Sequence, residues 1–155
     1  MPSISPRAQE LIEAARAWIG TPYRHQGRLR GHAVDCVGVV VEAALETGVL
    51  GVSRATFDQR FRPFRGYGRL PRPALVRQAL ATFMVEVPGG REGDVAFLRW
   101  DRGPPMHLAF LARHEGRPTM IHAHGWVGRC VEHGFDAEWP GRVDSWWRFP
   151  LLDQA

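Results

Sequence analysis

Apolar residues recur at helical spacing in the first half of the chain. Ser5 followed by Pro6 favours the start of a helix, and apolar residues then recur every three or four positions until Gly20. Asp35 suits a helix N-cap, and the mostly apolar run after it ends at Gly48, a residue typical of helix C-termini. Residues 73–84 also have one apolar face. The pattern predicts helices over 6–19, 36–48 and 73–84, with the second buried inside the protein.

The second half of the chain consists of short segments with strand propensity, separated by links that contain glycine or proline. Segments 21–34 and 53–73 show no sustained period, and we expect them to be loops. Helices followed by strands predict an α+β fold, with N-terminal helices packed on an antiparallel sheet of five to six strands. The expected strands are 94–100, 107–113, 119–124, 127–132 and 143–149.

A length of 155 residues is close to the commonest domain size, so we expect a single domain over 1–155. Hydrophobic residues at 45% and charged residues at 23% are ordinary for globular proteins, which excludes a disordered or coiled-coil chain. We expect neither a membrane span nor a signal peptide, because long apolar runs and a cleavage pattern are missing. Synthesis in the cytoplasm is therefore expected.

The net charge of +4 is unevenly distributed along the chain. Residues 53–73 carry six arginines and one acidic residue, Asp58, a local charge of +5 that leaves −1 for the remainder. Aromatic residues alternate loosely with these arginines, a composition that also occurs in nucleic-acid-binding proteins. We favour packing of the aromatic residues over a cleft, followed by docking through the arginines. Nucleic-acid binding is the weaker interpretation.

Cys36 is the residue with the clearest chemical potential. With Asp35 as the cap, its thiol lies in the first turn of a buried helix, where free backbone N–H groups and the helix dipole favour a thiolate. A nucleophile at this position needs a base within hydrogen-bonding reach. An inert core cysteine is the competing interpretation. The expected sheet supplies His107, His114, His122 and His124 as candidate bases.

Strand alternation decides which histidines share a face. His107 lies on the face of Ala109 and Leu111, and the small alanine leaves room for a helix end, so we expect this face to meet the helix. His122 and His124 also share a face of their strand. Either of them can bond the second nitrogen of His107 and fix its tautomer.

Metal binding and a disulfide are the weaker alternatives for the remaining ligand-type residues. His122, His124, Cys130 and His133 are of metal-ligand type, but their spacing matches no zinc motif, so we expect no metal. Cys130 lies within an expected strand and is interpreted as an ordinary buried cysteine. A reducing compartment disfavours a bridge between Cys130 and Cys36.

Five short motifs in a fixed order carry a resemblance to a known family. They are Trp18-Ile19-Gly20-Thr21-Pro22-Tyr23-Arg24, Asp35-Cys36-Val37-Gly38, Gly93-Asp94-Val95-Ala96-Phe97, His107-Leu108-Ala109 and Met120-Ile121-His122-Ala123. In this order they resemble the NlpC-type cell-wall cysteine peptidases, which have a compact papain-like fold. His25-Gln26 and the ending Trp146-Trp147-Arg148-Phe149-Pro150 look most like the branch encoded among phage tail genes and in gene transfer agents.

The resemblance implies that Cys36 is the nucleophile, His107 the general base and acid, and His122 the third polar residue. It also implies that Tyr23 lies beside the oxyanion region and that Asp35 can meet a free amine of the substrate. The implied substrates are peptidoglycan stem peptides, cleaved between D-γ-glutamate and a diamino acid without a cofactor. Tail-tip or baseplate proteins of a phage-like particle are the implied partners, and the cell wall is the implied site of action.

Two departures from the family pattern bear on the bond that is cleaved. Val37 replaces the usual serine after the nucleophile, and His25-Gln26-Gly27 replaces the usual Gly-Gly. Two other functions stay open. One is a catalytically silent structural component of a tail, and the other is a thiol amidase or acyltransferase that acts on a different amide.

Overall fold

The computed structural model describes residues 4–154, which form four α-helices and two antiparallel sheets. The helices are α1 (Pro6–Arg16), α2 (Cys36–Thr47), α3 (Arg54–Phe61) and α4 (Pro73–Phe83). A small hairpin contains β1 (Arg28–Leu29) and β2 (Ala33–Val34). The large sheet contains β3 (Val85–Val87), β4 (Val95–Leu98), β5 (His107–His114), β6 (Arg117–His124), β7 (Arg129–Gly134) and β8 (Val143–Arg148).

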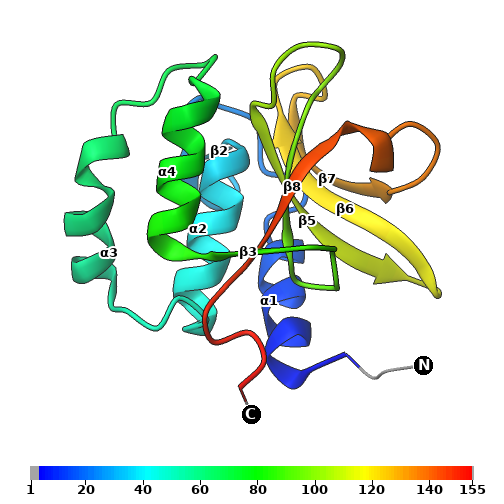
Figure 1. The fold of residues 1–155 in the computed structure, drawn as a ribbon, viewed down its shortest axis with the longest axis horizontal. Helices are drawn as coiled ribbons and strands as arrows, with labels where there is room; N and C mark the ends of the chain where they lie inside the picture. Colours follow the sequence, from blue (N-terminus) through cyan, green and yellow to red (C-terminus); the bar gives the residue numbers. More distant parts are fainter. Residues whose placement is uncertain (1–3, 155) are drawn as a thin grey trace.

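The large sheet has the strand order β3-β8-β4-β5-β6-β7, and every neighbouring pair is antiparallel. In Figure 1 helices α2, α3 and α4 lie to one side of this sheet, and α3 is the outermost of the three. Both ends of the described chain lie at the bottom of that view. The α+β class and the antiparallel sheet expected from the sequence are therefore confirmed.

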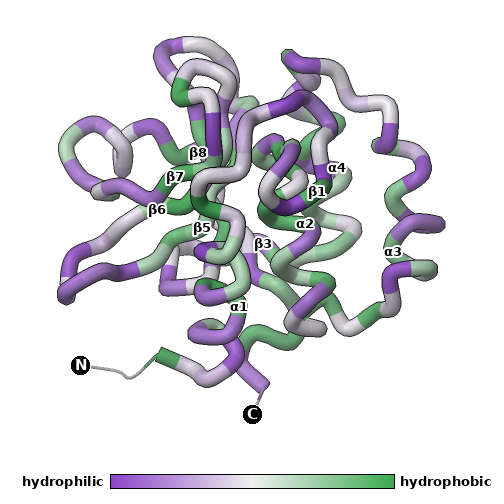
Figure 2. The backbone as a smooth tube through the Cα atoms, turned by 180° about the vertical axis from the view of Figure 1, so that it is seen from behind, coloured by the Kyte–Doolittle hydropathy of each residue, from purple (hydrophilic) through white to green (hydrophobic). Residues whose placement is uncertain are grey.

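Helix α2 is apolar on nearly all sides because other elements surround it. Its valine and alanine side chains are buried in one cluster with residues of α1 and of the sheet, including Leu11, Phe110 and Ile121. Figure 2 shows this helix as a mainly hydrophobic segment between α4 and the strands. A second, smaller cluster around Ala109 and Met120 covers the opposite face of the sheet. Burial of this apolar surface supplies most of the driving force for the fold.

The segment 53–73 is not simply the loop that the sequence led us to expect. It contains α3 and a 3-10 turn over Arg62–Phe64. Ser53 caps the helix by accepting a hydrogen bond from the N–H of Thr56. Phe57 and Phe61, four residues apart, are both buried and stack on each other. This spacing was a helical signal that the abundance of arginine obscured.

Smaller differences concern the ends of elements. Residues 21–34 contain the β1–β2 hairpin, and β3 is an additional edge strand. Helix α1 ends at Arg16, because the chain enters tight turns in which Trp18 and Ile19 donate to carbonyls three residues earlier. Strand β7 starts at Arg129 after a turn closed by a bond from Gly128 to the carbonyl of His124. The sequence pattern alone gives the ends of helices and strands only to within a few residues.

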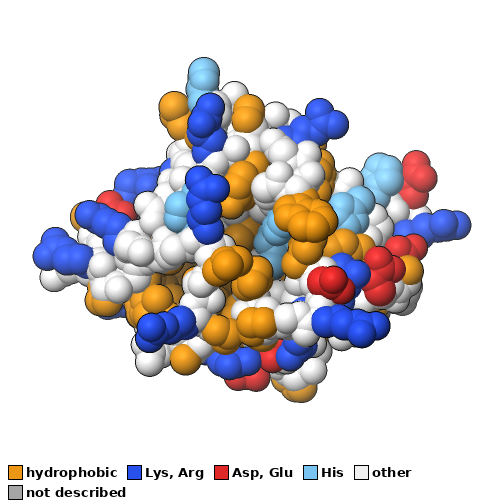
Figure 3. Space-filling model, turned by 90° about the horizontal axis from the view of Figure 1, so that it is seen from above, with side chains coloured by type: hydrophobic (Ala, Val, Ile, Leu, Met, Phe, Trp, Pro, Cys, Tyr) orange, Lys and Arg blue, Asp and Glu red, His pale blue; other side chains and the backbone are white. Residues whose placement is uncertain are grey.

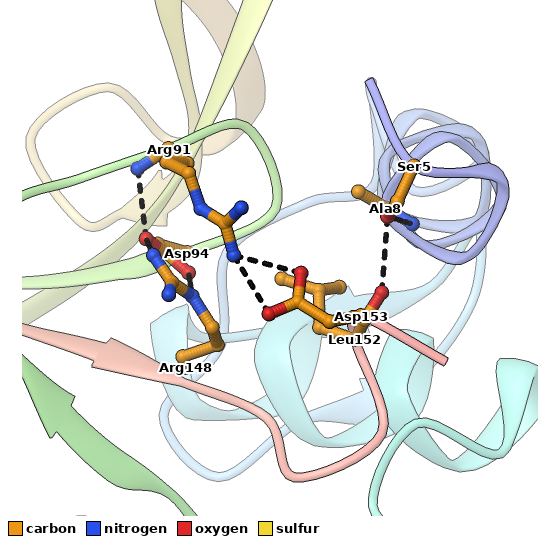
Figure 4. Close-up of polar contacts among 7 residues, drawn as sticks. All are labelled: Ser5, Ala8, Arg91, Asp94, Arg148, Leu152 and Asp153. Carbon is orange, nitrogen blue, oxygen red and sulfur yellow. Dashed lines mark hydrogen bonds and ion pairs between the residues drawn. The ribbon is translucent and has the colours of Figure 1, made fainter. Parts of the chain in front are cut away.

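A buried ion pair joins strands β4 and β8. Asp94 is completely buried, and its two carboxylate oxygens each accept a 2.8 Å hydrogen bond from Arg148. The same carboxylate accepts a 2.7 Å bond from the backbone N–H of Arg91 (Figure 4). These bonds fix the turn before β4 against the last residue of β8.

The C-terminal segment packs against the start of α1. Ser5 accepts a hydrogen bond from the N–H of Ala8 as the N-cap of α1, and its hydroxyl donates to the carbonyl of Leu152 at 3.0 Å (Figure 4). Arg91 also pairs with Asp153, and both side chains are more than half exposed. The N-cap residue of α1, Ser5, therefore connects the two ends of the described chain.

We predict that Asp94→Ala lowers the free energy of unfolding by about 3–5 kcal/mol, because it leaves the Arg148 guanidinium without its buried partner. Urea unfolding of the purified protein measures the change. Asp153→Ala removes the exposed partner of Arg91 and serves as the control, with an expected loss of about 0–1 kcal/mol. Equal losses in the two variants would contradict the structural role assigned to Asp94.

Candidate active site

Cys36 is the first residue of α2, and its sulfur meets the first residues of β5. Asp35 caps the helix by accepting a 2.8 Å bond from the N–H of Gly38. The backbone N–H of Leu108 lies near enough to the Cys36 sulfur to favour its thiolate form. Leu108 follows His107 directly, and the pairing of β5 with β6 begins only at Phe110. The helix start therefore meets the open end of β5, next to His107.

Two glycines allow the chain before α2 to approach the helix closely. A Cβ atom added to Gly38 would collide with the carbonyl oxygen of Gly27. A Cβ atom on Gly27 would lie 2.7 Å from the backbone nitrogen of Val34. The same stretch is held by Gln26, whose N–H donates to Asp35 at 2.7 Å. Residues without side chains at 27 and 38 are thus a condition for this arrangement.

Burial decides the charge state of the candidate nucleophile. Burial, and then the negative charge of Asp35, raise the pKa of the Cys36 thiol to about 12. The N–H groups of Leu108, Val37 and Cys36 itself favour the thiolate, but they are outweighed. The sequence-based expectation of a thiolate considered the helix start without the burial around it, and that burial favours the neutral thiol.

His107 and His122 form a buried hydrogen-bonded pair. Nε2 of His107 lies 2.7 Å from Nδ1 of His122, and both residues are at most 2% exposed. Burial, followed by the neighbouring His122, lowers the pKa of His107 well below its usual 6.5. Burial, followed by His133 and His124, lowers the pKa of His122 to about 3. Both imidazoles are therefore neutral, and a neutral imidazole can accept a proton.

The face of β5 that carries His107 does not face the helices. Leu108 and Phe110 belong to the core shared with α1 and α2, whereas Ala109 belongs to the cluster on the other face. The expected use of the small Ala109 to admit the helix was thus wrong. Cys36 and His107 each begin their element, and the start of α2 lies near Leu108, the residue that follows His107.

His124 shares the face of His122 but has different partners. Its ring stacks on Trp100 at a centroid distance of 3.7 Å and an angle of 1°. Its Nδ1 accepts a bond from the N–H of Trp126. The hydrogen-bond partner of His107 is therefore His122, whereas the ring of His124 packs on Trp100.

The sequence reasoning missed the position of His133 beside the site. Its Nε2 lies 2.7 Å from Nε2 of His122. His133 had been considered only as a metal-ligand type. Alternation along β7 could have placed His133 on the face of His122, but only if β7 was known to pair with β6. That pairing is known from the fold and not from the sequence.

Tyr23 and Asp35 lie in the same region as Cys36. Burial is the main cause of the raised pKa of Tyr23, followed by its proximity to Cys36 and Asp35. Asp35 is only 3% exposed, and one of its oxygens accepts bonds from the N–H of Gln26 and, at 2.6 Å, from the hydroxyl of Tyr67. Gln26 and Tyr67 therefore share one oxygen of Asp35.

Tyr67, which the sequence reasoning also missed, is anchored over the start of α2. Its carbonyl oxygen lies 3.1 Å from Nε2 of His25 and accepts a 2.8 Å bond from the side chain of Gln26. Burial, then the charge of Asp35, raises its pKa. His25 and Gln26 therefore hold the segment after α3 in place.

Figure 3 shows one face of the molecule, seen from above. Histidine and hydrophobic side chains lie next to each other in its centre, and arginine side chains are spread around them. Within residues 4–154, no group of three or more histidine, cysteine or acidic side chains is arranged to hold a metal ion. None of the helices in that range is long and apolar enough to cross a membrane.

A comparison with protein-family models gives no match, and a comparison with curated protein sequences also gives none. Among solved structures, the NlpC/p60 domain of the peptidoglycan hydrolase SagA is similar, with a TM-score of 0.55 and 20% identity, over 91% of this chain and 97% of that domain. The fold is that of NlpC/P60 domains.

A second structure with this fold is a Staphylococcus aureus protein described as similar to a lipoprotein of the NLP/P60 family. Its TM-score is 0.59 and its identity 17%, over 96% of this chain. The match covers 43% of the staphylococcal protein, so the chain spans less than half of that protein's length. With identities this low, the likeness is one of the NlpC/P60 fold.

The lowered pKa values of His107 and His122 predict a loss of stability in acid. At pH values below 6.5, the usual pKa of histidine, these two residues bind protons in the unfolded chain but stay unprotonated in the folded chain. The free energy of unfolding therefore falls as the pH decreases from about 6.5 to about 5, by up to about 1.4 kcal/mol per pH unit for each group.

Urea unfolding at a series of pH values measures this slope. Replacing His122 (His122→Gln) should reduce the slope, whereas His32→Gln, at an exposed position outside the pair, should leave it unchanged. A wild-type free energy of unfolding that does not change in this window would contradict burial of two neutral imidazoles.

Proposed function

We propose that this protein is a cysteine peptidase that hydrolyses peptidoglycan stem peptides. One observation supports the proposal: within an NlpC/P60 fold, the Cys36 sulfur lies near the N–H of Leu108, and Leu108 directly follows His107, which forms a buried hydrogen-bonded pair with His122. A thiol, a neutral imidazole and a second group that orients the imidazole are the parts that thiol-based acyl transfer needs.

The reaction begins with a neutral thiol and a neutral imidazole. As the Cys36 sulfur attacks the carbonyl carbon of the scissile amide, Nδ1 of His107 takes the thiol proton, because Nε2 is occupied by His122. The backbone N–H of Cys36 is a donor for the oxyanion that forms. His107 then gives the proton to the leaving amine nitrogen, the C–N bond breaks, and a thioester remains. Water, deprotonated by His107, hydrolyses the thioester and frees the acid and the thiol.

The stem-peptide substrate is supported by the peptidoglycan hydrolase SagA, whose domain has this fold. Within the stem peptide, we propose the bond between D-γ-glutamate and the diamino acid, on the motif resemblance. In this assignment Asp35 receives the free amine of the substrate and Tyr23 lies beside the oxyanion. Because Tyr67 occupies one oxygen of Asp35, the amine has to displace the Tyr67 hydroxyl or share that oxygen with it.

We propose that the protein acts on the cell wall as part of a phage-like or gene transfer agent tail. The support is the resemblance carried by His25-Gln26 and by residues 146–150. The exposed arginines of segment 53–73 suit docking to tail-tip or baseplate proteins, whereas burial of Phe57 and Phe61 removes aromatic rings that could stack on bases. These arginines are Arg54, Arg60, Arg62, Arg65, Arg69 and Arg72.

We predict that Cys36→Ala abolishes hydrolysis of purified peptidoglycan, because the acyl group has no other sulfur to bind at this position. Mass spectrometry of the soluble muropeptides measures the products. Cys130→Ala removes the only other cysteine and should keep the cleavage activity. New stem-peptide fragments from the wild type support the proposal.

Other outcomes of this experiment point to other functions. Release of intact stem peptides or transfer of acyl groups would indicate an amidase or acyltransferase. No change with the folded wild-type protein would indicate a structural component. Retained cleavage by Cys36→Ala would move the nucleophile elsewhere.

We predict that Tyr67→Phe lowers KM for a stem peptide with a free amino terminus, because it releases one oxygen of Asp35 for the amine. Steady-state kinetics with this peptide and with its N-acetylated form measure the effect, and the acetylated peptide should show no gain. A higher KM for the free amine would contradict the prediction and would indicate that the hydroxyl instead positions Asp35.

A further inference from the structure

Three histidine side chains form a hydrogen-bonded row across three adjacent strands. Nε2 of His107 on β5 lies 2.7 Å from Nδ1 of His122 on β6. Nε2 of His122 lies 2.7 Å from Nε2 of His133 on β7. The row ends at the backbone carbonyl of Gly134, 3.0 Å from Nδ1 of His133. His133 has no part in the mechanism described so far.

The register of the sheet explains why these rings meet. His122 pairs with Val131 and Met120 pairs with His133, so His122 and His133 are diagonal neighbours on one face. Their rings are nearly perpendicular, at 79°, as are those of His107 and His122. The Trp139 ring lies beside both His122 and His133. Packing thus supports the orientation in which the nitrogens face one another.

The acidic residue next to His133 does not join the row. Glu132 is bonded to Arg16 and to the hydroxyl of Thr119, because alternation along β7 directs it to the other side of the sheet. The partner that anchors His133 is therefore a carbonyl oxygen and not a carboxylate.

A carbonyl oxygen can only accept a hydrogen bond, so Nδ1 of His133 has to carry a proton. In the neutral ring Nε2 is then an acceptor, and Nε2 of His122 has to donate to it. Nδ1 of His122 becomes an acceptor in turn, and Nε2 of His107 donates to it. In this arrangement Nδ1 of His107 carries no proton and keeps its lone pair.

We propose that His133 is a positioning residue: anchored by the carbonyl of Gly134, it selects the tautomers of His122 and His107 that leave Nδ1 of His107 free to accept the Cys36 proton. This inference rests on the proposed function, since Nδ1 of His107 matters for catalysis only if Cys36 is the nucleophile. In the opposite tautomer, Nδ1 of His107 would carry a proton and could not act as the base.

His122 by itself does not make this selection. A neutral imidazole can carry its proton on either nitrogen, and the hydrogen bond between His107 and His122 can form in both directions. The direction is decided where the row meets a group that cannot donate, which is the carbonyl of Gly134. His133 transmits that constraint to the buried pair.

The tautomers can be read from the imidazole ¹⁵N chemical shifts of the labelled full-length protein, which distinguish protonated from unprotonated ring nitrogens. We expect unprotonated Nδ1 in His107 and His122 and unprotonated Nε2 in His133. A protonated Nδ1 in neutral His107 of the wild type would overturn the proposal, whatever the activity.

Kinetics of stem-peptide hydrolysis test the consequence. His133→Phe keeps a ring but removes the acceptor, so we expect kcat to fall about 10- to 100-fold with KM changed less than about twofold. His133→Gln puts an amide oxygen near the position of Nε2 and should restore kcat to within about threefold of the wild type. His114→Gln, at an exposed position on β5, is the matched control and should keep the wild-type kcat.

The outcomes separate this inference from the proposed function. If Cys36→Ala is inactive but His133→Phe has the wild-type kcat, the peptidase stands and the role of His133 is rejected. If Cys36→Ala stays active, the proposed function fails, and the ¹⁵N shifts still decide whether the row sets the tautomers. If His133→Phe does not fold, the shifts of the wild type and the kcat and shifts of His133→Gln decide the question.

Discussion

The contact between the capped start of α2 and the open end of β5 is the interaction on which the candidate site depends. Asp35 caps the helix, and the N–H of Leu108 lies near the sulfur of Cys36. The contact needs an apolar helix that can be buried between other helices and the sheet, and a close approach of the preceding chain that glycine permits at Gly38. The position of the thiol is therefore a result of packing as much as of helix formation.

Burial has opposite effects on the pKa values of Cys36 and His107 and favours the neutral form of each side chain. It raises the pKa of the Cys36 thiol and lowers that of His107. A resting ion pair is thus disfavoured, and proton transfer has to accompany attack on a substrate. Such a pair depends on the tautomer of the imidazole, because a neutral ring has only one nitrogen that can accept a proton. The hydrogen-bonded row of His107, His122 and His133 sets this tautomer.

The segment 53–73 has two roles that follow from its two kinds of residue. Phe57 and Phe61 on α3 are buried, and Phe57 packs against Phe83 of α4. Tyr67 extends from this segment to Asp35, while most of its arginines stay exposed. The exposed arginines and the hydrogen bond from Tyr67 to Asp35 therefore belong to one structural unit.

The sequence by itself determined the α+β class, the capped apolar helix that begins at Cys36 and most strands, because periodicity and caps are local properties. The order of the sequence motifs also identified Cys36, His107 and His122 as candidate catalytic residues. Only the tertiary structure decided that His122 and not His124 bonds His107, that His133 completes the row and that Tyr67 covers Asp35. These contacts join residues distant in the chain, and strand register and burial, which set them, are properties of the packed molecule.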